Sequence, residues 1–259
     1  MKFNTFIIDT TKIIKGKLET LSKNKIKWIK SLKLKKNRDN ENLFIIEGKK
    51  IILETIKFHS NNIKLICSTE KIKFKNIPSY IIDKNIMKEI SSLKTPNNLI
   101  AIVKKPIFKN KPSNSLIVVL DNIQDPGNMG SILRTCDWFK VDKVICSKKT
   151  VDIFNTKVIQ SSMGSIFRIP VEYHYLPDYL KQTKLPIYGT LINEGENIYK
   201  NKFIQNEAII IIGNEGNGIS KEIISYINKF ITIPRFGKTE SLNASIATGI
   251  ILSEFRRMN

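Results

Sequence analysis

Short apolar runs alternate with helical stripes along the second half of the chain. The runs are typical of buried strands and cover residues 116–120, 143–146, 187–190, 208–212 and 230–233. More polar segments separate them, and one of these has clear helical spacing. Strands and helices in alternation predict a mostly parallel sheet with helices on both faces.

Two helices of this half have recognisable beginnings. Asp125 followed by Pro126 is typical of an N-cap and a first helical residue. The last helix is expected over residues 241–256, with Ser241 as its N-cap. It is apolar or small on nearly all sides, which fits either a central core helix or a helix shared with a second subunit. The apolar face of the earlier helix consists of Met129, Ile132, Leu133, Cys136 and Phe139.

The first half predicts a separate, smaller α/β domain. Residues 106–115 contain two prolines and no apolar periodicity, so they are predicted to be a linker. The expected organisation is an arm at 1–17, a small domain at 18–105, the linker, and a larger domain at 116–259. Helices are expected at 21–36, 51–56 and 83–90, and strands or strand-like apolar runs at 43–46, 63–67, 80–82 and 99–103.

The net charge of +20 is concentrated in the first half of the chain. Residues 1–115 carry 26 basic and 9 acidic side chains, whereas residues 116–259 carry 17 and 14. An AT-rich genome enriches lysine, but it would act on both halves alike. The excess therefore indicates contact with a polyanion, and the ten lysines from Lys12 to Lys36 are its densest part.

Membrane and secreted proteins are disfavoured. The longest aliphatic run has about five residues, far fewer than the ~18 that a membrane span needs. The apolar patch that ends at Asp9 is too short for a signal peptide. The cysteines are odd in number and widely spaced, which suits a reduced, cytoplasmic location: Cys67, Cys136 and Cys146.

Familiar catalytic sets are missing from the sequence. His59 and His174 are expected at the surface. No Ser-His-Asp set, metal cluster or spaced pair of carboxylates can be identified. A catalytic site in this chain would therefore use asparagine, arginine, glutamate and serine.

Three loops follow predicted strands, at the edge where parallel sheets bind ligands. The first, residues 121–135, has two glycines that permit close backbone approach, with Asn128 at the turn and Arg134 away from the apolar stripe. A capped turn with an exposed arginine explains it equally well. The third, residues 233–250, brings Leu242 and Asn243 to the beginning of the last helix.

The second loop lies within residues 209–220 and has three glycines in six residues. Its spacing fits neither the dinucleotide fingerprint nor the phosphate-binding P-loop. Glu215 at its centre is either a turn residue without a partner or a carboxylate among backbone donors. The clustered glycines favour the second interpretation.

Together the three loops resemble, in order and spacing, the motifs of the SpoU/TrmH family of SPOUT-class RNA 2′-O-ribose methyltransferases. The matching strings are DPGNMGSILRT, IIGNEGNGIS and IPRFGKTESLNASIATGIILSE. The resemblance covers residues 116–259. The basic segment from residue 21 resembles the small ribosomal-protein-like substrate-binding domain that precedes the catalytic domain in many members. Arg235 and Phe236 depart from the family, in which methionine often follows the Ile-Pro pair.

The resemblance implies a trefoil knot in the parallel sheet, a homodimer with the site near its interface, and S-adenosylmethionine held in the knot. It implies no metal and no membrane. The residues that it assigns to the methyl donor are Thr190, Leu191, Gly213, Ile233 and Leu242.

For the reaction, the resemblance assigns Arg134 to the ribose 2′-hydroxyl. Arg134 would act either as a base with a lowered pKa or as a group that orients the oxygen and stabilises its developing charge. The residues that would hold the reacting groups in register are Asn128, Glu215, Ser241 and Asn243.

The implied partner is RNA, with 23S-type ribosomal RNA ahead of transfer RNA. A non-catalytic RNA-binding assembly protein with the same fold is one alternative. A Rossmann-type methyltransferase is another, but it would need a glycine-rich turn after its first strand, whereas the glycine cluster here comes late.

Overall fold

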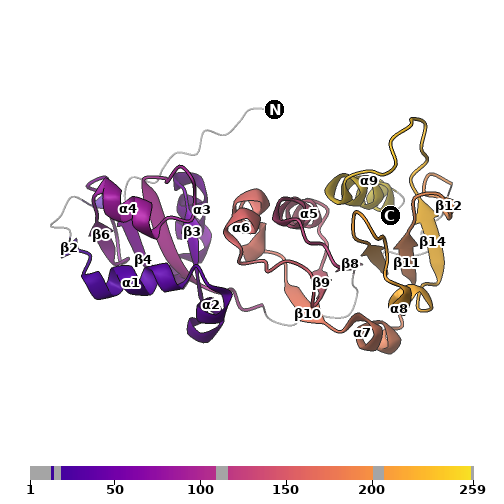
Figure 1. Ribbon diagram of the computed structural model, residues 1–259, viewed down its shortest axis with the longest axis horizontal. Helices are drawn as coiled ribbons and strands as arrows, with labels where there is room; N and C mark the ends of the chain where they lie inside the picture. Colours follow the sequence, from indigo (N-terminus) through magenta and orange to yellow (C-terminus); the bar gives the residue numbers. More distant parts are fainter. Residues whose placement is uncertain (1–12, 15–18, 109–115, 201–206, 258–259) are drawn as a thin grey trace. The chain divides into compact units, whose positions relative to one another are not determined.

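The computed structural model describes residues 13–14, 19–108, 116–200 and 207–257. The chain divides into two compact units between Ile107 and Phe108 (Figure 1). Nearly all of the predicted arm and linker lies outside the described residues.

The first unit is built on a five-stranded sheet in the order β2-β6-β4-β7-β3. β7 runs antiparallel to both of its neighbours, whereas β2, β6 and β4 are parallel to one another. A separate antiparallel pair joins β1 (Ile13–Ile14) to β5 (Lys73–Phe74). The strands of the five-stranded sheet are β2 (Glu19–Thr20), β3 (Leu43–Glu47), β4 (Ile63–Ser68), β6 (Ser79–Ile81) and β7 (Leu99–Lys104).

The prediction of a single helix over residues 21–36 is wrong. Two helices occur instead, α1 (Lys23–Ser31) and α2 (Lys35–Glu41). Arg38 explains the break, because its buried guanidinium donates to the carbonyls of Leu32, at 3.1 Å, and Lys33, at 2.7 Å. These backbone acceptors are thus satisfied outside a continuous helix. The other helical segments of this unit are α3 (Lys49–His59), η2 (Ser60–Asn62) and α4 (Lys84–Ile90).

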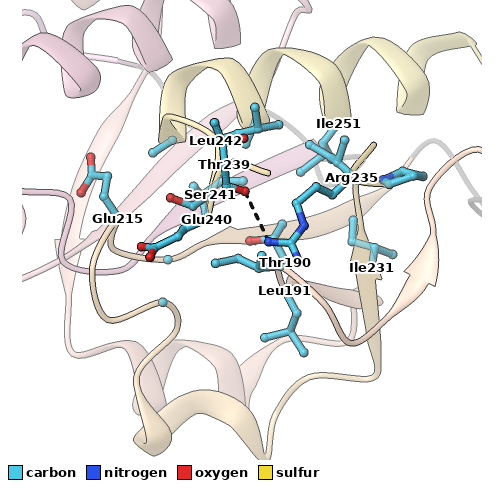
Figure 2. A pocket seen from close by; sticks show the side chains of 18 of the residues that line it. Thr190, Leu191, Glu215, Ile231, Arg235, Thr239, Glu240, Ser241, Leu242 and Ile251 are labelled. Atoms are coloured by element: carbon cyan, nitrogen blue, oxygen red, sulfur yellow. Dashed lines mark hydrogen bonds between the residues drawn. The ribbon is translucent and has the colours of Figure 1, made fainter. Parts of the chain in front are cut away.

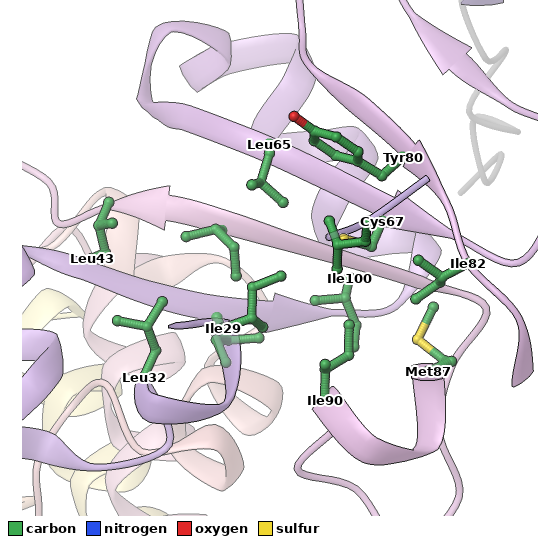
Figure 3. Close-up of a cluster of buried hydrophobic side chains, with 13 residues drawn as sticks. Ile29, Leu32, Leu43, Leu65, Cys67, Tyr80, Ile82, Met87, Ile90 and Ile100 are labelled. Carbon is green, nitrogen blue, oxygen red and sulfur yellow. The ribbon is translucent and has the colours of Figure 1, made fainter. Parts of the chain in front are cut away.

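The core of the first unit lies between α1, α4 and the sheet (Figure 3). Ile29 of α1 and Ile90 of α4 are fully buried against strand residues such as Ile100. Burial of a large aliphatic side chain contributes about 1.5–3 kcal/mol. The apolar positions that the sequence places on one side of α1 therefore fix this helix on the sheet.

The second unit contains a seven-stranded sheet in which every neighbouring pair is parallel. This confirms the predicted parallel sheet. Its order is β10-β9-β8-β13-β11-β14-β12. The strands are β8 (Leu116–Leu120), β9 (Lys143–Ser147), β10 (Val171–His174), β11 (Ile187–Thr190), β12 (Glu196–Asn197), β13 (Ala208–Ile212) and β14 (Lys229–Thr232).

Helices cover both faces of this sheet, as predicted. Figure 1 shows α5, α6 and α9 on one side and α7 and α8 on the other. The α7/α8 side buries Ile117, Val119, Ile209 and Ile211, so the alternate residues of β8 and β13 face the opposite helices. The helical segments are α5 (Pro126–Trp138), α6 (Thr156–Ser162), η3 (Ser165–Phe167), α7 (Leu176–Gln182), α8 (Lys221–Ile224) and α9 (Ala244–Arg257).

The order of the strands in this sheet differs from their order along the chain. β11 lies between β13 and β14, although it precedes both in the chain. Of the strands that carry the three loops, β8 and β13 pair directly, and β14 lies one strand away from β13. The trefoil knot remains a prediction of the family resemblance.

Ser241 is not the N-cap of the last helix, contrary to the prediction. α9 begins at Ala244, and the side-chain oxygen of Asn243 accepts from the backbone N–H of Ser245 at 2.9 Å. Asn243 is two residues closer to the helix and its carbonyl already accepts from Ala247. Within one chain, α9 is not buried on all sides, because Ile246 is 55% exposed.

Candidate active site

A cavity of about 280 Å³ opens at the carboxyl edge of the parallel sheet in the second unit (Figure 2). Thr190 ends β11, Ile212 ends β13 and Ile233 directly follows β14, and all three line it. The first turns of α9 close one wall through Ala244 and Ala247. Ligands of open α/β sheets occupy this position.

All five residues assigned to the methyl donor line this cavity: Thr190, Leu191, Gly213, Ile233 and Leu242. Glu215 and Ser241 line it as well. Other parts of the wall were not assigned to the site from the sequence, above all most residues from Pro234 to Glu240, and Ile251 of α9. That segment and Ile251 belong to the third motif string, but the resemblance assigned only Ile233, Ser241, Leu242 and Asn243 of that string to the site.

The glycine-rich loop is closed by a side chain that the sequence did not single out. Asn214 exchanges two backbone hydrogen bonds of 2.9 Å with Gly218. Its side-chain oxygen accepts from the N–H groups of Gly216, at 2.9 Å, and Asn217, at 3.0 Å, while its Nδ2 donates to the Asn122 carbonyl at 2.8 Å. Asn214, rather than Glu215, therefore accepts from the loop's backbone donors.

Gly213 is required by close backbone approach. A Cβ atom on this residue would lie 2.4 Å from the carbonyl carbon of Gly218 and 2.6 Å from the amide nitrogen of Ile219. Backbone atoms cannot yield as a flexible side chain can. Only glycine lets β13 lead into this closed loop, and this explains part of the glycine clustering in the sequence.

Side chains from all three loops meet in one hydrogen-bonded chain. Asn243 Nδ2 donates to Asn128 Oδ1 at 2.8 Å, and Asn128 Nδ2 donates to Glu215 Oε1. Asn243 Oδ1 in turn accepts from the backbone and hydroxyl of Ser245, at 2.9 and 2.6 Å. Because a backbone N–H can only donate, Ser245 fixes the orientation of Asn243, and the chain runs in one direction toward the carboxylate.

The beginning of α5 holds Asn128 in place. Asp125 is its N-cap, as predicted, and Oδ1 of Asp125 accepts from the Asn128 N–H at 2.7 Å. That hydrogen bond holds the pKa of the Asp125 carboxyl below its usual range. α5 also packs tightly on α6, since a Cβ on Gly130 would lie 2.6 Å from the Val158 carbonyl.

Arg134 lies apart from these groups. It is exposed on α5, does not line the cavity, and makes no hydrogen bond or ion pair with any residue that the structure describes. Within one protomer, this predicted residue therefore belongs neither to the cavity nor to the hydrogen-bonded row of Asn243, Asn128 and Glu215. Its guanidinium is available to an external ligand.

His174 is partly exposed, as the sequence predicts. Its side chain is 41% exposed and lies 3.0 Å from Glu172. Across the described residues, no cluster of His, Cys, Asp and Glu could hold a metal ion. None of the described helices is both long and apolar enough to cross a membrane.

Comparisons with known proteins agree with this arrangement. The model of the SpoU rRNA Methylase family matches residues 115–253, and the model of the MRM3-like substrate binding domain matches residues 23–101. The chain is 29% identical over 248 residues to the 23S rRNA (guanosine(2553)-2′-O)-methyltransferase RlmP of Bacillus subtilis, which covers 92% of this chain and 98% of the relative.

Two solved structures are similar over both units. A putative RNA methyltransferase of the TrmH family from Porphyromonas gingivalis has 33% identity and a TM-score of 0.82, covering 93% of this chain and 100% of the other. An AdoMet-bound rRNA methyltransferase from Sinorhizobium meliloti has 25% identity and a TM-score of 0.79, covering 93% and 97%. With its motifs joined in one site and its catalytic half matched throughout, the chain belongs to the SpoU rRNA methylase family.

Proposed function

We propose that this protein transfers a methyl group from S-adenosylmethionine to a ribose 2′-hydroxyl of RNA, and that the RNA is of the 23S ribosomal type. The observation that carries the proposal is the contact of Asn128 with both Glu215 and Asn243 beside the cavity. The ribosomal substrate named for the Bacillus subtilis relative supports the choice of RNA.

The cavity suits S-adenosylmethionine in its charge and lining. The charged side chains among its described lining residues are Glu215, Glu240 and Arg235. S-adenosylmethionine carries two cationic groups, a sulfonium and an ammonium, and one carboxylate, so the signs are complementary. Apolar side chains such as Ile231 and Leu242 supply the wall that an adenine ring needs.

When bound, S-adenosylmethionine supplies a methyl group on a sulfonium, and the neutral thioether S-adenosylhomocysteine is an excellent leaving group. The protein must therefore act on the nucleophile, because a sugar hydroxyl is almost un-ionised at neutral pH. Glu215, Asn128 and Asn243 hold one another in a fixed arrangement at the edge of the cavity. Preorganised groups of this kind lower a barrier by roughly 7–11 kcal/mol when they align the reactants.

Arg134 is the group we assign to the 2′-hydroxyl. It has no partner among the described residues, so RNA binding does not require an existing ion pair to break. A guanidinium near the attacking oxygen stabilises the negative charge that develops there. Ser241 lines the cavity and is assigned to holding the bound donor or ribose in place.

The first unit is assigned to RNA binding. It contains most of the excess positive charge, and its family model is that of a substrate-binding domain. Each phosphate that a lysine neutralises steepens the dependence of log K on log salt by about 0.7–0.9. A chain shortened to residues 116–259 should therefore bind RNA with a shallower salt dependence than the full chain.

A homodimer is part of the proposal. Ile246 on α9 and Trp138 on α5 are 55% and 80% exposed, and these two helices pack against each other. Large apolar side chains on neighbouring helices are typical of a surface that a second copy covers. The expected location is the cytoplasm.

Methyl incorporation into RNA tests the proposal. Arg134→Ala should abolish transfer of labelled methyl groups to ribosomal RNA from cells that lack the gene, while calorimetry shows donor binding close to that of the parent. Lys148→Ala removes another exposed cation of the same unit and should leave transfer unchanged. Unchanged turnover in the arginine variant would remove Arg134 from the reaction.

Mapping identifies the RNA. The 2′-O-methyl sites of total RNA, compared with and without the gene, should differ at a position of the large ribosomal RNA. A difference confined to transfer RNA would move the substrate to that class, and failure of the parent protein to bind the donor or methylate either RNA would support the non-catalytic alternative.

A further inference from the structure

A second cavity, of about 200 Å³, lies in the first unit at one end of its five-stranded sheet. β7 runs antiparallel to β3 and β4, so the carboxyl ends of those two strands meet the beginning of β7. Ser68, at the end of β4, pairs with Leu99, and Lys49 begins α3 directly after β3 and Gly48. Ser68, Leu99 and Lys49 all line the cavity.

The floor of this cavity is apolar. Phe74 and Leu99 are buried, and Leu53 and Ile72 are half-buried, at its walls. A cavity of this volume is smaller than the ~300–1,000 Å³ of sites that enclose drug-sized ligands. Its size suits one ring system rather than a large molecule.

Two polar side chains beside the apolar floor have unused hydrogen-bonding capacity. The amide of Asn97 is half-buried and makes no hydrogen bond with any described residue. Ser68 is 2% exposed, and its Oγ accepts from the Glu70 N–H at 2.9 Å, so its hydroxyl proton has no acceptor within the described part of the chain. A buried hydroxyl without an acceptor is costly unless a ligand or water provides one.

The charges favour a neutral ring held beside phosphates. Glu70 and Lys49 carry opposite charges in the cavity lining, and the Glu70 carboxylate accepts from Asn98 Nδ2 at 3.3 Å, so the lining charges balance and a neutral group fits inside. Lysines flank the lining segments outside. All four of these lysines are exposed. Three are sequence neighbours of lining residues, and the fourth lies three residues before Asn97: Lys50, Lys71, Lys75 and Lys94.

We propose that this cavity receives one unstacked nucleobase of the RNA substrate. The apolar floor packs on the faces of the base, and Asn97 and Ser68 hydrogen-bond its edge, while the surrounding lysines contact the flanking phosphates. The inference rests on the proposed function in one respect, since it takes RNA as the ligand. It adds a site for substrate recognition in the unit that does not contain the donor cavity.

Binding of two RNA probes by the full chain tests the proposal. One probe is a random-sequence single-stranded RNA of about 20 nucleotides, and the other is an abasic ribose-phosphate strand of the same length, which keeps the phosphates and removes the bases. Asn97→Leu removes the amide, and Leu53→Trp fills the cavity. Asn85→Leu makes the same change as the first variant at an exposed position of α4 and serves as the matched control.

We expect Asn97→Leu and Leu53→Trp to weaken binding of the base-containing probe by about 5- to 100-fold, the contribution of one well-packed base. Binding of the abasic probe should stay unchanged, as should binding of both probes by the control. Photocrosslinking of the base-containing probe should label the segments that contain Ile72 and Asn97. A circular dichroism melt identifies any variant that fails to fold. In that case the crosslinks of the parent protein alone test whether the cavity binds a base.

Two results would overturn the proposal. One is equal affinity of the parent and both folded cavity variants for the base-containing probe. The other is crosslinking that spares both cavity segments while labelling other parts of the protein. None of these measurements uses the methyl donor. Failure of the cavity to bind a base can therefore be distinguished from failure of the proposed function, which would show as an absence of methyl transfer.

Discussion

The hydrogen bond from Asn128 to Glu215 can be tested by an almost isosteric change, Asn128→Asp. The introduced carboxyl keeps an oxygen that accepts from Asn243 Nδ2, but it replaces the Nδ2 group that donates to Glu215. Two carboxylates then face each other where an amide and a carboxylate met. The change therefore isolates one donor without creating a cavity.

The magnitude follows from charge and exposure. Two like charges 4 Å apart repel by about 4 kcal/mol at an effective dielectric constant of 20. Asn128 and Glu215 are both half-buried, so solvent screening reduces this repulsion, and we expect a net loss of about 2 kcal/mol in the free energy of unfolding at pH 8. For a unit of this size, that loss lowers the melting temperature by about 4–8 °C.

The loss should depend on pH in a defined direction. The neighbouring carboxylate raises the pKa of the introduced carboxyl above the ~3.9 of an unfolded aspartate. Between these two values the folded state binds more protons than the unfolded state, so stability falls as the pH rises through that window. At pH 5 the protonated group can again donate to Glu215, and the deficit should be smaller than at pH 8.

Differential scanning calorimetry at pH 5 and pH 8 measures this deficit. The matched control is Asn155→Asp, which makes the same change of charge at the N-cap of α6, where Oδ1 accepts from the Lys157 N–H and a carboxylate serves equally well. Methyl transfer by Asn128→Asp should recover in the same direction as the stability. A deficit that is equal at both pH values, or equal to that of the control, would refute the reasoning.

Three further outcomes are expected. Gly213→Ala should cost about 1–3 kcal/mol of stability and abolish binding of S-adenosylmethionine by calorimetry, because its Cβ would lie 2.4 Å from a backbone carbon; Gly249→Ala, outside the cavity lining and with a Cβ no closer than 3.8 Å to a neighbour, is the control. Gly130→Ala should lower the melting temperature of the second unit by several degrees through its clash with α6, without changing the donor affinity of the folded protein. Burial raises the pKa of the Cys67 thiol to about 12 and raises those of Cys136 and Cys146 still further, so a thiol reagent at pH 8 should label all three only at the rate of unfolding; immediate labelling of the native protein would contradict this.

Local features explain what the sequence alone could predict of the fold. The apolar runs that became β8 and β13 are entirely buried, and a continuous apolar run is the pattern of a strand covered on both faces. Asp125 and Pro126 begin α5 as predicted, because capping depends on residues two or three positions away. An error arose where a side chain beyond the helical spacing intervened, since Arg38 folds back over five and six residues to stabilise the break after α1.

The recognised motifs already contained most residues of the site, but the motifs did not predict which of these residues hydrogen-bond to one another. Glu215 lies 87 positions from Asn128, and Asn243 lies 115 positions from it. Their meeting depends on the pairing of β8 with β13 and on the beginning of α9 reaching the same sheet edge. Residue type and local pattern thus determined the elements and the candidate groups, whereas strand order and close backbone packing decided which groups touch, because contacts between distant segments form only when the sheet assembles.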